Sequence, residues 1–474
     1  MSQKHNLFNL LFEKNFILFP ILLLFFGIKL LDFNLPYFWD EAWSYIPAIK
    51  EMATQGPSLL PNSISPDLYR GHPLLFYFLS SSWLRFFGDE LGVMRLFSFL
   101  ISSGLLVSIY FLAKKLFDYK IATIATFTFL IQSVFLAQAT FLLPEILLTL
   151  FTVLSFHAYF TRKIILLVLW LTLALFTKES GAIIWVTILF SELLQMQKNY
   201  SKIGLSKSFY SLISLTIPIL FISTFFIIQK TKVGWFFFPE HIHYLSYTSL
   251  LGKLESYSSY LFIYMGRNLL TFIGLIALVG ISIRKKKSLS TKKEILIPFT
   301  FFIISYLLFS SINFYSPRYI LSVLPFTTLI FIFLIYEFLK TKKIILTSVL
   351  IIILLNNTWF SLNNKQGNDH TLGYRDLIEV QIKAIDYCEK NNFYTKNITT
   401  QFLMKHNLTN KNLGYLKNDK SFSNITNTIT DSTNYIIICS NEVDKTIYKK
   451  QKLGVLIKTF KKDKCWTEIY KVNP

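Results

Sequence analysis

The residue types best suited to chemistry stand in one polar stretch, residues 33–90, between two apolar runs. Its first feature is a pair of adjacent acids, Asp40 and Glu41. An ionised carboxylate within hydrogen-bond reach of a hydroxyl can take its proton as a general base. The same pair could instead cap a helix beginning at Ala42, because negative groups favour helix N-termini. The pattern leaves both interpretations open.

A basic cluster follows in the same stretch, Arg70 and His72 directly before Pro73. Both side chains can donate hydrogen bonds to phosphate oxygens, and proline suits the first turn of a helix. An isolated His-Pro pair is better explained as a helix start, but this cluster shares its loop with two acids. The stretch therefore predicts a site where proton abstraction and phosphate binding meet, beside amphipathic aromatic segments typical of a membrane interface.

Three further charged positions interrupt apolar runs: Glu145, Lys178 (followed by Glu179) and Arg318. Each alone could be an ordinary residue that extends its charged end to water, or half of a local ion pair. Together they place one glutamate and two cations on the side of the membrane that carries Asp40. They are candidates for substrate positioning and phosphate binding.

Metal and redox chemistry have weak support. His241 and His243 flank Ile242 near Glu240, but no third ligand is placed. The cysteines 388, 439 and 465 are unevenly spaced and form no CxxC pair. We assign no metal ligands and no resident cofactor, and the sequence leaves a divalent metal open without requiring one.

The composition is that of a membrane protein. Of the 474 residues, 53% are hydrophobic and only 16% are charged, too few for the surface of a soluble enzyme. The net charge of +21 lies mostly in short loops and accompanies no nucleic-acid-binding fold, so we exclude a nucleic-acid partner. The apolar run from Phe16 to Leu31 has no small-residue cleavage site after it and is expected to be a retained helix.

Residues 1–360 are predicted to form an all-α polytopic domain of about eleven transmembrane helices plus interfacial helices. Lysine and arginine are concentrated in every second loop, and loops rich in these residues are typically cytoplasmic. The N-terminus is therefore expected to be cytoplasmic. The loops 33–90 and 230–264, and everything after residue 360, are then extracytoplasmic. The expected spans are 16–32, 92–113, 121–138, 141–160, 164–177, 180–196, 209–229, 265–283, 295–311, 319–339 and 342–359.

Residues 361–474 are predicted to form a small extracytoplasmic α/β domain. The segment GYRDLIEVQIKAIDYCEKN has the spacing of an amphipathic helix, and YIIICS, GVLIKTF and CWTEIYKV look like strands. The Lys-, Asn-, Ile- and Phe-rich usage hints at an AT-rich bacterial genome. A multi-pass plasma membrane location, the bacterial inner membrane, is therefore expected.

Taken together, the first-loop motifs WDEAWSY and RGHPLLFYFL, followed by MRLFSFLISSGLLVSIYFLAKKLF, resemble a known family. It is the C superfamily of membrane glycosyltransferases that use polyprenyl-phosphate sugars, in the branch of the protein O-mannosyltransferases and the aminoarabinose transferase of lipid A. LPEILLTLF, LALFTKESGAIIW and SPRYILSVLPF are similar to its later motifs. The resemblance covers roughly residues 16–340.

The resemblance implies a hexosyl- or pentosyltransferase with its active site on the outer face of the membrane. Asp40 would be the catalytic base and Glu41 its neighbour in substrate positioning. His72, with Arg70 beside it, falls at the basic position associated with the donor phosphate. Lys178 and Arg318 also match positions associated with the donor phosphate, although Glu179 replaces the small residue that usually follows the lysine. Glu145 matches a position associated with substrate positioning.

Other interpretations stay open. The sequence distinguishes poorly between a transferase of single sugars and a ligase or polymerase acting on a whole lipid-linked oligosaccharide. A transporter or flippase of lipid-linked glycan predicts charges in the middle of spans and repeat symmetry, and neither is evident. The expected partners are the polyprenyl-phosphate sugar and membrane lipids. The acceptor could be a cell-envelope lipid such as lipid A, a protein Ser/Thr or a surface polysaccharide.

Overall fold

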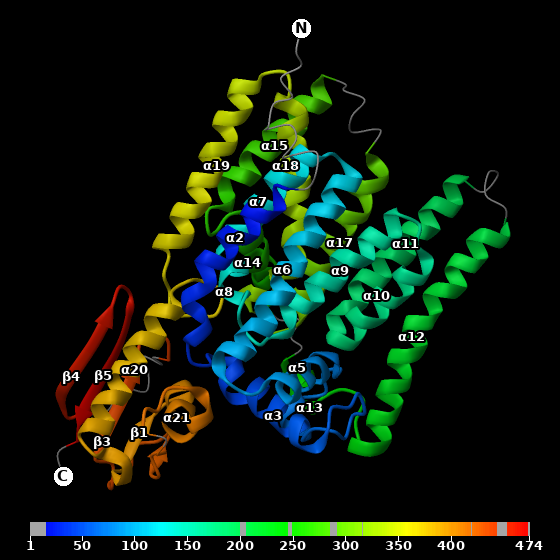
Figure 1. Ribbon diagram of the computed structural model, residues 1–474. Coiled ribbons are helices and arrows are strands. Elements are labelled where there is room, and N and C mark those ends of the chain that lie inside the picture. The colour runs from blue at the N-terminus through cyan, green and yellow to red at the C-terminus, as the bar shows by residue number, and fades with distance from the viewer. Residues whose placement is uncertain are drawn as a thin grey trace.

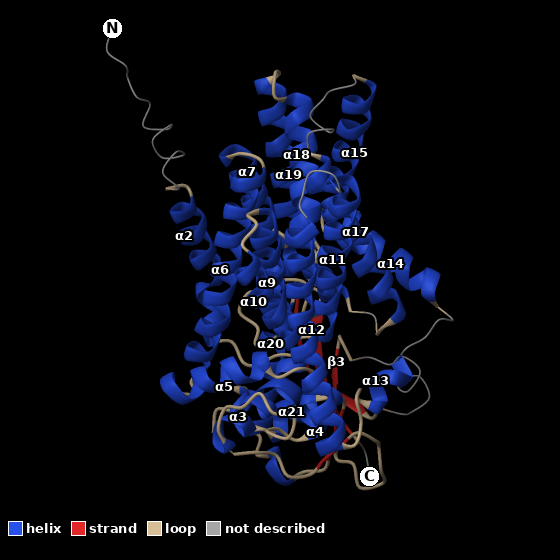
Figure 2. Cartoon of the chain, turned by 90° about the vertical axis from the view of Figure 1, so that its right-hand side faces the viewer, coloured by secondary structure: helices blue, strands red, loops and turns tan. Residues whose placement is uncertain are grey.

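The computed structural model describes residues 16–199, 205–244, 249–284, 292–314, 316–418, 420–442 and 453–472. Long helices run side by side in a bundle, and a small sheet with its own helices lies at one end (Figure 1). The first polar loop lies at that same end, so two segments that are distant in sequence meet there (Figures 1 and 2).

Every predicted span contains a helix, because uninterrupted apolar runs satisfy their backbone groups internally. One prediction was wrong in detail: the span 121–138 is two helices, broken at Ile131 and Gln132. The helices are α2 (Leu18–Lys29), α6 (Leu91–Leu116), α7 (Tyr119–Leu130), α8 (Ser133–Gln138), α9 (Pro144–Phe160), α10 (Ile164–Thr177), α11 (Ala182–Asn199), α12 (Leu205–Val233), α15 (Arg267–Ile283), α17 (Lys293–Ile312), α18 (Leu324–Leu339) and α19 (Lys343–Asn363).

Among the described residues, four helices are long and apolar enough to cross a membrane by themselves: α6, α12 from Tyr210, α17 and α19. The pair α14 (Leu250–Phe262) and α15, bent by 86°, gives a fifth if it is one span. Helices α7, α9, α10 and α18 are apolar but shorter. The chain is therefore a multi-pass membrane protein, while the predicted number of about eleven spans is not confirmed.

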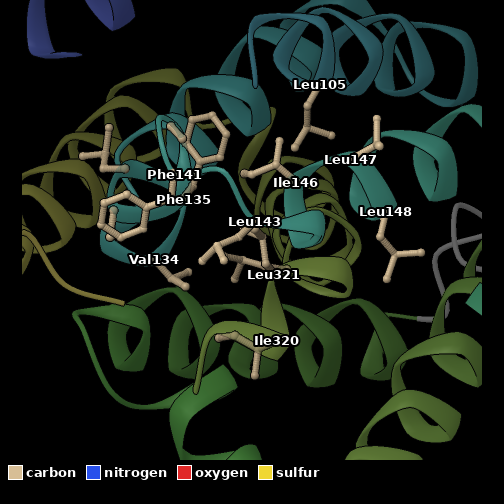
Figure 3. Close-up of a cluster of buried hydrophobic side chains, with 14 of the residues drawn as sticks. Leu105, Val134, Phe135, Phe141, Leu143, Ile146, Leu147, Leu148, Ile320 and Leu321 are labelled. Atoms are coloured by element: carbon tan, nitrogen blue, oxygen red, sulfur yellow. The ribbon is translucent and has the colours of Figure 1, made fainter. Parts of the chain in front are cut away.

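Close packing positions the central helices. A Cβ added at Gly274 of α15 would lie 2.4 Å from the Phe331 side chain of α18. One added at Gly280 would lie 2.3 Å from the Phe338 side chain. Small residues allow helices to approach this closely inside a membrane. Figure 3 shows the buried core where Leu143 and Ile146 meet Ile320 and Leu321. These residues adjoin the two charged positions 145 and 318, so this core fixes the relative position of the two charges.

The first loop is mostly helical rather than irregular. It contains α3 (Ile46–Gln55), α4 (Pro66–Tyr69) and α5 (Leu75–Phe87), and a short irregular helix, Glu41–Tyr45, precedes α3. Trp83 and Leu84 of α5 pack against the protein, whereas Phe86 and Phe87 are exposed, as in a helix lying on a membrane interface. The second polar loop supplies α13 (Pro239–Tyr244) and α14.

After α19 the chain forms a mixed five-stranded sheet in the order β2-β1-β3-β5-β4, with α20 (Tyr374–Lys390) packed on β4 and β5. The predicted helix and the three predicted strands correspond to α20, β3 (Tyr435–Cys439), β4 (Val455–Lys462) and β5 (Cys465–Lys471). The sequence analysis missed the short β1 (Ile398–Thr400) and β2 (Ile425–Thr426), as well as α21 (Phe402–Thr409). The division into a membrane domain, residues 1–360, and a separate C-terminal domain, residues 361–474, stays a prediction.

A buried ionic cluster attaches this C-terminal part to the first helix. Asp32 accepts hydrogen bonds from Arg375 Nε at 2.7 Å and from the Tyr374 hydroxyl at 2.6 Å, and it pairs with Lys29. Lys29 also donates to the Leu136 carbonyl at 2.7 Å. Asp32 and Lys29 are almost fully excluded from solvent. Their charges are compensated by each other and by the start of α20, which fixes the C-terminal part against the bundle.

Candidate active site

Asp40 lies where the first loop bends into the irregular helix, and both of its carboxylate oxygens are held. The indole Nε1 of Trp43 donates to Oδ1 at 2.9 Å, and the guanidinium of Arg318 contacts Oδ2. The side chain is 20% exposed. A fixed carboxylate that still reaches solvent suits proton abstraction from an incoming hydroxyl better than helix capping.

Arg318 connects three carboxylates that are far apart in sequence. It contacts Asp40 and Asp369 through its terminal nitrogens, and its Nε lies 3.4 Å from Glu145 Oε1. Burial opposes the charged form of Arg318, but Asp40, Asp369 and Glu145 outweigh burial and hold the pKa of Arg318 well above its ordinary value. The guanidinium is therefore a permanent positive centre at this position.

Lys178 continues the cluster from the turn between α10 and α11. Its Nζ donates to Glu145 Oε1 at 2.9 Å and lies 4.1 Å from the centre of the Tyr319 ring. Burial lowers the pKa of Lys178, but the charge of Glu145 more than compensates and raises it above the ordinary value. The second oxygen of Glu145, Oε2, is buried without a hydrogen-bond partner among the described residues.

His72 is oriented by Glu179, the residue that departs from the family motif. His72 Nδ1 lies 2.9 and 3.0 Å from the two carboxylate oxygens of Glu179. Burial raises the pKa of Glu179, but His72 outweighs burial and brings it below the ordinary value. Because Nδ1 is occupied, Nε2 is the ring nitrogen left for a ligand. His241 stacks beside His72 with ring centres 5.1 Å apart, and burial together with His72 lowers the pKa of His241 to about 4.

A cavity of about 350 Å³ opens beside these groups. One part of its wall carries the basic residues Arg70, His72 and Lys178, with the carboxylate of Glu179 beside them. Trp235 packs over Gly71, where an added Cβ would lie 2.8 Å from the indole, so the loop carrying α13 closes over this basic part. The rest of the wall is mainly aromatic and apolar, with Phe237, Phe238, Ile242, Tyr306, Phe309, Phe314 and Tyr319. An anionic headgroup joined to a long apolar chain matches this combination.

Glu41 does not share this cluster. It is fully buried and pairs with Arg95 Nη1 at 2.6 Å, while it accepts hydrogen bonds from the Leu142 and Phe38 amides at 2.6 and 3.0 Å. Burial raises the pKa of Glu41, and the charge of Arg95 opposes that rise. Glu41 thus joins the first loop to α6 and to the segment before α9.

We expect Glu41→Gln to destabilise the protein without a direct chemical effect. The change leaves Arg95 buried and unpaired, which costs on the order of 3–5 kcal/mol. Thermal unfolding of the purified protein should show a clearly lower Tm, and Glu90→Gln at an exposed position should leave Tm unchanged. An unchanged Tm for Glu41→Gln would contradict the structural role of this ion pair.

The structure brings together Asp40, Glu145, Lys178 and Arg318 through direct contacts, and it places Arg70 and His72 on the wall of the adjacent cavity. The sequence analysis missed Asp369. Its carboxylate contacts Arg318, and its backbone carbonyl accepts from Gln138 at 2.6 Å. The part of the chain that the structure describes holds no group of three His, Cys, Asp or Glu residues suited to a metal ion.

Residues 71–228 match the family model described as dolichyl-phosphate-mannose-protein mannosyltransferase. No curated protein matches the sequence. ArnT from Cupriavidus metallidurans in the apo state aligns over 95% of this chain and 98% of its own, at 12% identity and a TM-score of 0.54. The same ArnT bound to undecaprenyl phosphate aligns over 95% of this chain and 97% of its own, at 12% identity and a TM-score of 0.53.

The Archaeoglobus fulgidus oligosaccharyltransferase in complex with Zn and sulfate aligns over 90% of this chain and 68% of its own, at 12% identity and a TM-score of 0.51. These structural likenesses concern the fold, and the family model adds sequence similarity from Gly71 and His72 through the helices that follow. They agree with the resemblance found in the sequence: residues 71–228 are similar to the mannosyltransferase family model, and the fold is similar to those of ArnT and the oligosaccharyltransferase.

Proposed function

We propose that this chain transfers a sugar, with inversion, from a polyprenyl-phosphate-linked donor to an acceptor hydroxyl on the outer face of the membrane. The observation that carries the proposal is the contact between Asp40 and Arg318, whose neighbour Tyr319 lines the cavity. One contact thus connects a partly exposed carboxylate to a basic, apolar-walled space. The ArnT structure bound to undecaprenyl phosphate supports a polyprenyl-phosphate donor.

In this mechanism Asp40 accepts the proton of the acceptor hydroxyl as the oxygen attacks the anomeric carbon. The bond between that carbon and the phosphate oxygen breaks, and its electron pair stays on the phosphate. Attack from the side opposite the phosphate inverts the configuration. Arg70, His72 and Lys178 on the cavity wall donate hydrogen bonds that stabilise the charge developing on the departing phosphate, and the desolvated setting strengthens this effect.

The proposed roles of the remaining residues follow from their contacts. Arg318 orients Asp40, and Glu145 positions Lys178 and Arg318. Glu41 acts indirectly, since it holds the loop that carries Asp40. A divalent metal is not required where arginine and lysine take the charge.

The orientation is part of the proposal. The lysine and arginine asymmetry of the loops supports a cytoplasmic N-terminus, and the site and C-terminal part would then face the extracytoplasmic side of the inner membrane. The acceptor would belong to the cell envelope, as a lipid, a polysaccharide or a protein.

The donor site can be tested by binding. We expect undecaprenyl phosphate to raise the Tm of the purified protein and undecaprenol to have little effect, because the cavity cations recognise the phosphate. Replacement of His72 by alanine should weaken undecaprenyl phosphate binding by roughly tenfold or more, the value of one charge-assisted hydrogen bond. Lys396→Ala, at an exposed position in the C-terminal part, is the matched control.

Equal stabilisation by the phosphate and the alcohol would contradict the proposed donor site. A transporter or flippase of lipid-linked glycan would bind the same lipid, and the two functions are separated by the product. Transfer predicts release of free undecaprenyl phosphate and a glycosylated acceptor, whereas transport predicts an intact donor in the opposite leaflet. A ligase or polymerase would require a donor carrying a whole oligosaccharide.

A further inference from the structure

Beside Asp40 lies an aromatic cluster that the mechanism above does not use. Trp39 and Trp43 flank Asp40 in the first loop, and Phe402 of α21 meets both edge to face, with ring centres 6.2 and 5.5 Å apart. His406, one turn further along α21, packs on Phe402 at 5.6 Å. We call Trp39, Trp43, Phe402 and His406 the aromatic surface.

The aromatic surface is available to a ligand. Phe402 is 39% exposed, and Trp39, Trp43 and His406 are partly exposed. Trp39 has a positive φ of 53°, a backbone conformation that is rare for bulky residues and costs energy. Strain of this kind is found mainly at functional sites, where the surrounding structure maintains it.

The aromatic surface is also linked to the catalytic groups. The Trp43 indole donates to Asp40, and the guanidinium of Arg70 lies 4.0 Å from the centre of a Trp43 ring. Arg70 lines the donor cavity as well, and its Nε is buried without a hydrogen-bond partner among the described residues. A ligand on the aromatic surface would therefore lie beside both the proposed base Asp40 and the donor cavity, as an acceptor must.

We propose that the aromatic surface is the acceptor site and that the acceptor is a carbohydrate. This inference rests on the proposed transferase function and names its acceptor class. The weakly positive C–H face of a sugar ring packs on the negative face of an aromatic ring. The sugar's hydroxyl groups can then reach Asp40 and Arg70.

A peptide acceptor fits this surface less well. Extended peptides usually bind through unpaired backbone groups at a sheet edge. Here the surface lies on two helical segments whose backbone groups are already engaged: Ala42 N donates to Trp39 O at 2.9 Å, and Met404 N to Glu442 Oε1 at 3.3 Å. Recognition must come from side chains, which suits a rigid ring bearing hydroxyl groups. The inference also gives the C-terminal part a role, because α21 supplies Phe402 and His406.

The test uses the purified full-length protein and a panel of methyl glycosides of hexoses and N-acetylhexosamines, with a Ser/Thr-containing peptide as the alternative acceptor. Binding is followed by tryptophan fluorescence and by saturation-transfer NMR. We expect saturable binding of at least one glycoside, which weakens by roughly tenfold in Phe402→Ala because one aromatic face is lost. Phe402→Trp should restore it. The matched control is Leu456→Ala, a similarly exposed apolar side chain on β4.

Undecaprenyl phosphate binding is measured on the same samples, so the two proposals can fail separately. If the wild type does not bind undecaprenyl phosphate, the donor site is refuted, and the transferase function is refuted with it. Normal undecaprenyl phosphate binding with no saturable glycoside binding, or with binding that Phe402→Ala leaves unchanged, overturns the carbohydrate acceptor alone. Saturable binding of the peptide that Phe402→Ala weakens would assign the surface to a protein acceptor instead.

Discussion

Asp40→Asn is expected to lower kcat by about 10²–10⁴-fold, the usual contribution of a positioned general base. The amide keeps the shape of the side chain, and its oxygen can still accept a hydrogen bond from Trp43 or Arg318, but it cannot take a proton. The affinity for undecaprenyl phosphate should stay close to that of the wild type, because Asp40 does not line the donor cavity. The measurement is single-turnover transfer of a radiolabelled sugar from an undecaprenyl-phosphate donor.

The control is Asp67→Asn, since Asp67 is an exposed aspartate in the same loop. It should transfer sugar at the wild-type rate. Equal turnover by Asp40→Asn and the wild type would refute the assigned base. A parallel loss of donor affinity and rate would instead give Asp40 a role in assembling the site, because its contact with Arg318 would then matter more than its proton affinity.

The helical framework could be predicted from the sequence because it depends on local properties. Apolar runs must form helices in lipid, and short runs rich in β-branched and aromatic residues, such as YIIICS and CWTEIYKV, are typical of strands regardless of their partners. The break between α7 and α8 was missed because residues 121–138 contain no glycine or proline that would mark it at Ile131 and Gln132. The short strand β2 has only two residues, too few to show a period.

Side-chain partners could not be predicted, because they depend on contacts between distant segments. Asp40 and Glu41 are neighbours in sequence, yet the chain turn at Trp39 directs one to Arg318 and the other to Arg95. Asp369 lies in a polar segment after the last span, and it contacts Arg318 where the nearby start of α20 is held by Asp32. Nothing in the sequence around Asp369 indicates a partner more than fifty positions earlier.

Arg318→Met is expected to impair stability and activity together. Methionine removes the only charge that contacts Asp40, Asp369 and Glu145 at once among the described residues. Taking away one partner of a buried ionic group costs on the order of 3–5 kcal/mol, because the remaining charges stay desolvated and repel each other. We expect a strongly lowered Tm and sugar transfer reduced to background, measured on protein purified in the same detergent as the wild type.

The separate contributions can be resolved with Asp369→Asn, which removes one negative charge and leaves Arg318 bound to Asp40 and Glu145. This variant should fold, because three carboxylates surround Arg318 and two remain. In the Arg318→Met background, Asp369→Asn should recover part of the lost Tm, since one uncompensated carboxylate is gone, but it should recover no activity, because Asp40 still lacks its cation. Additive losses of Tm in the double variant would show that Asp369 and Arg318 act independently and that the ionic cluster is not one unit.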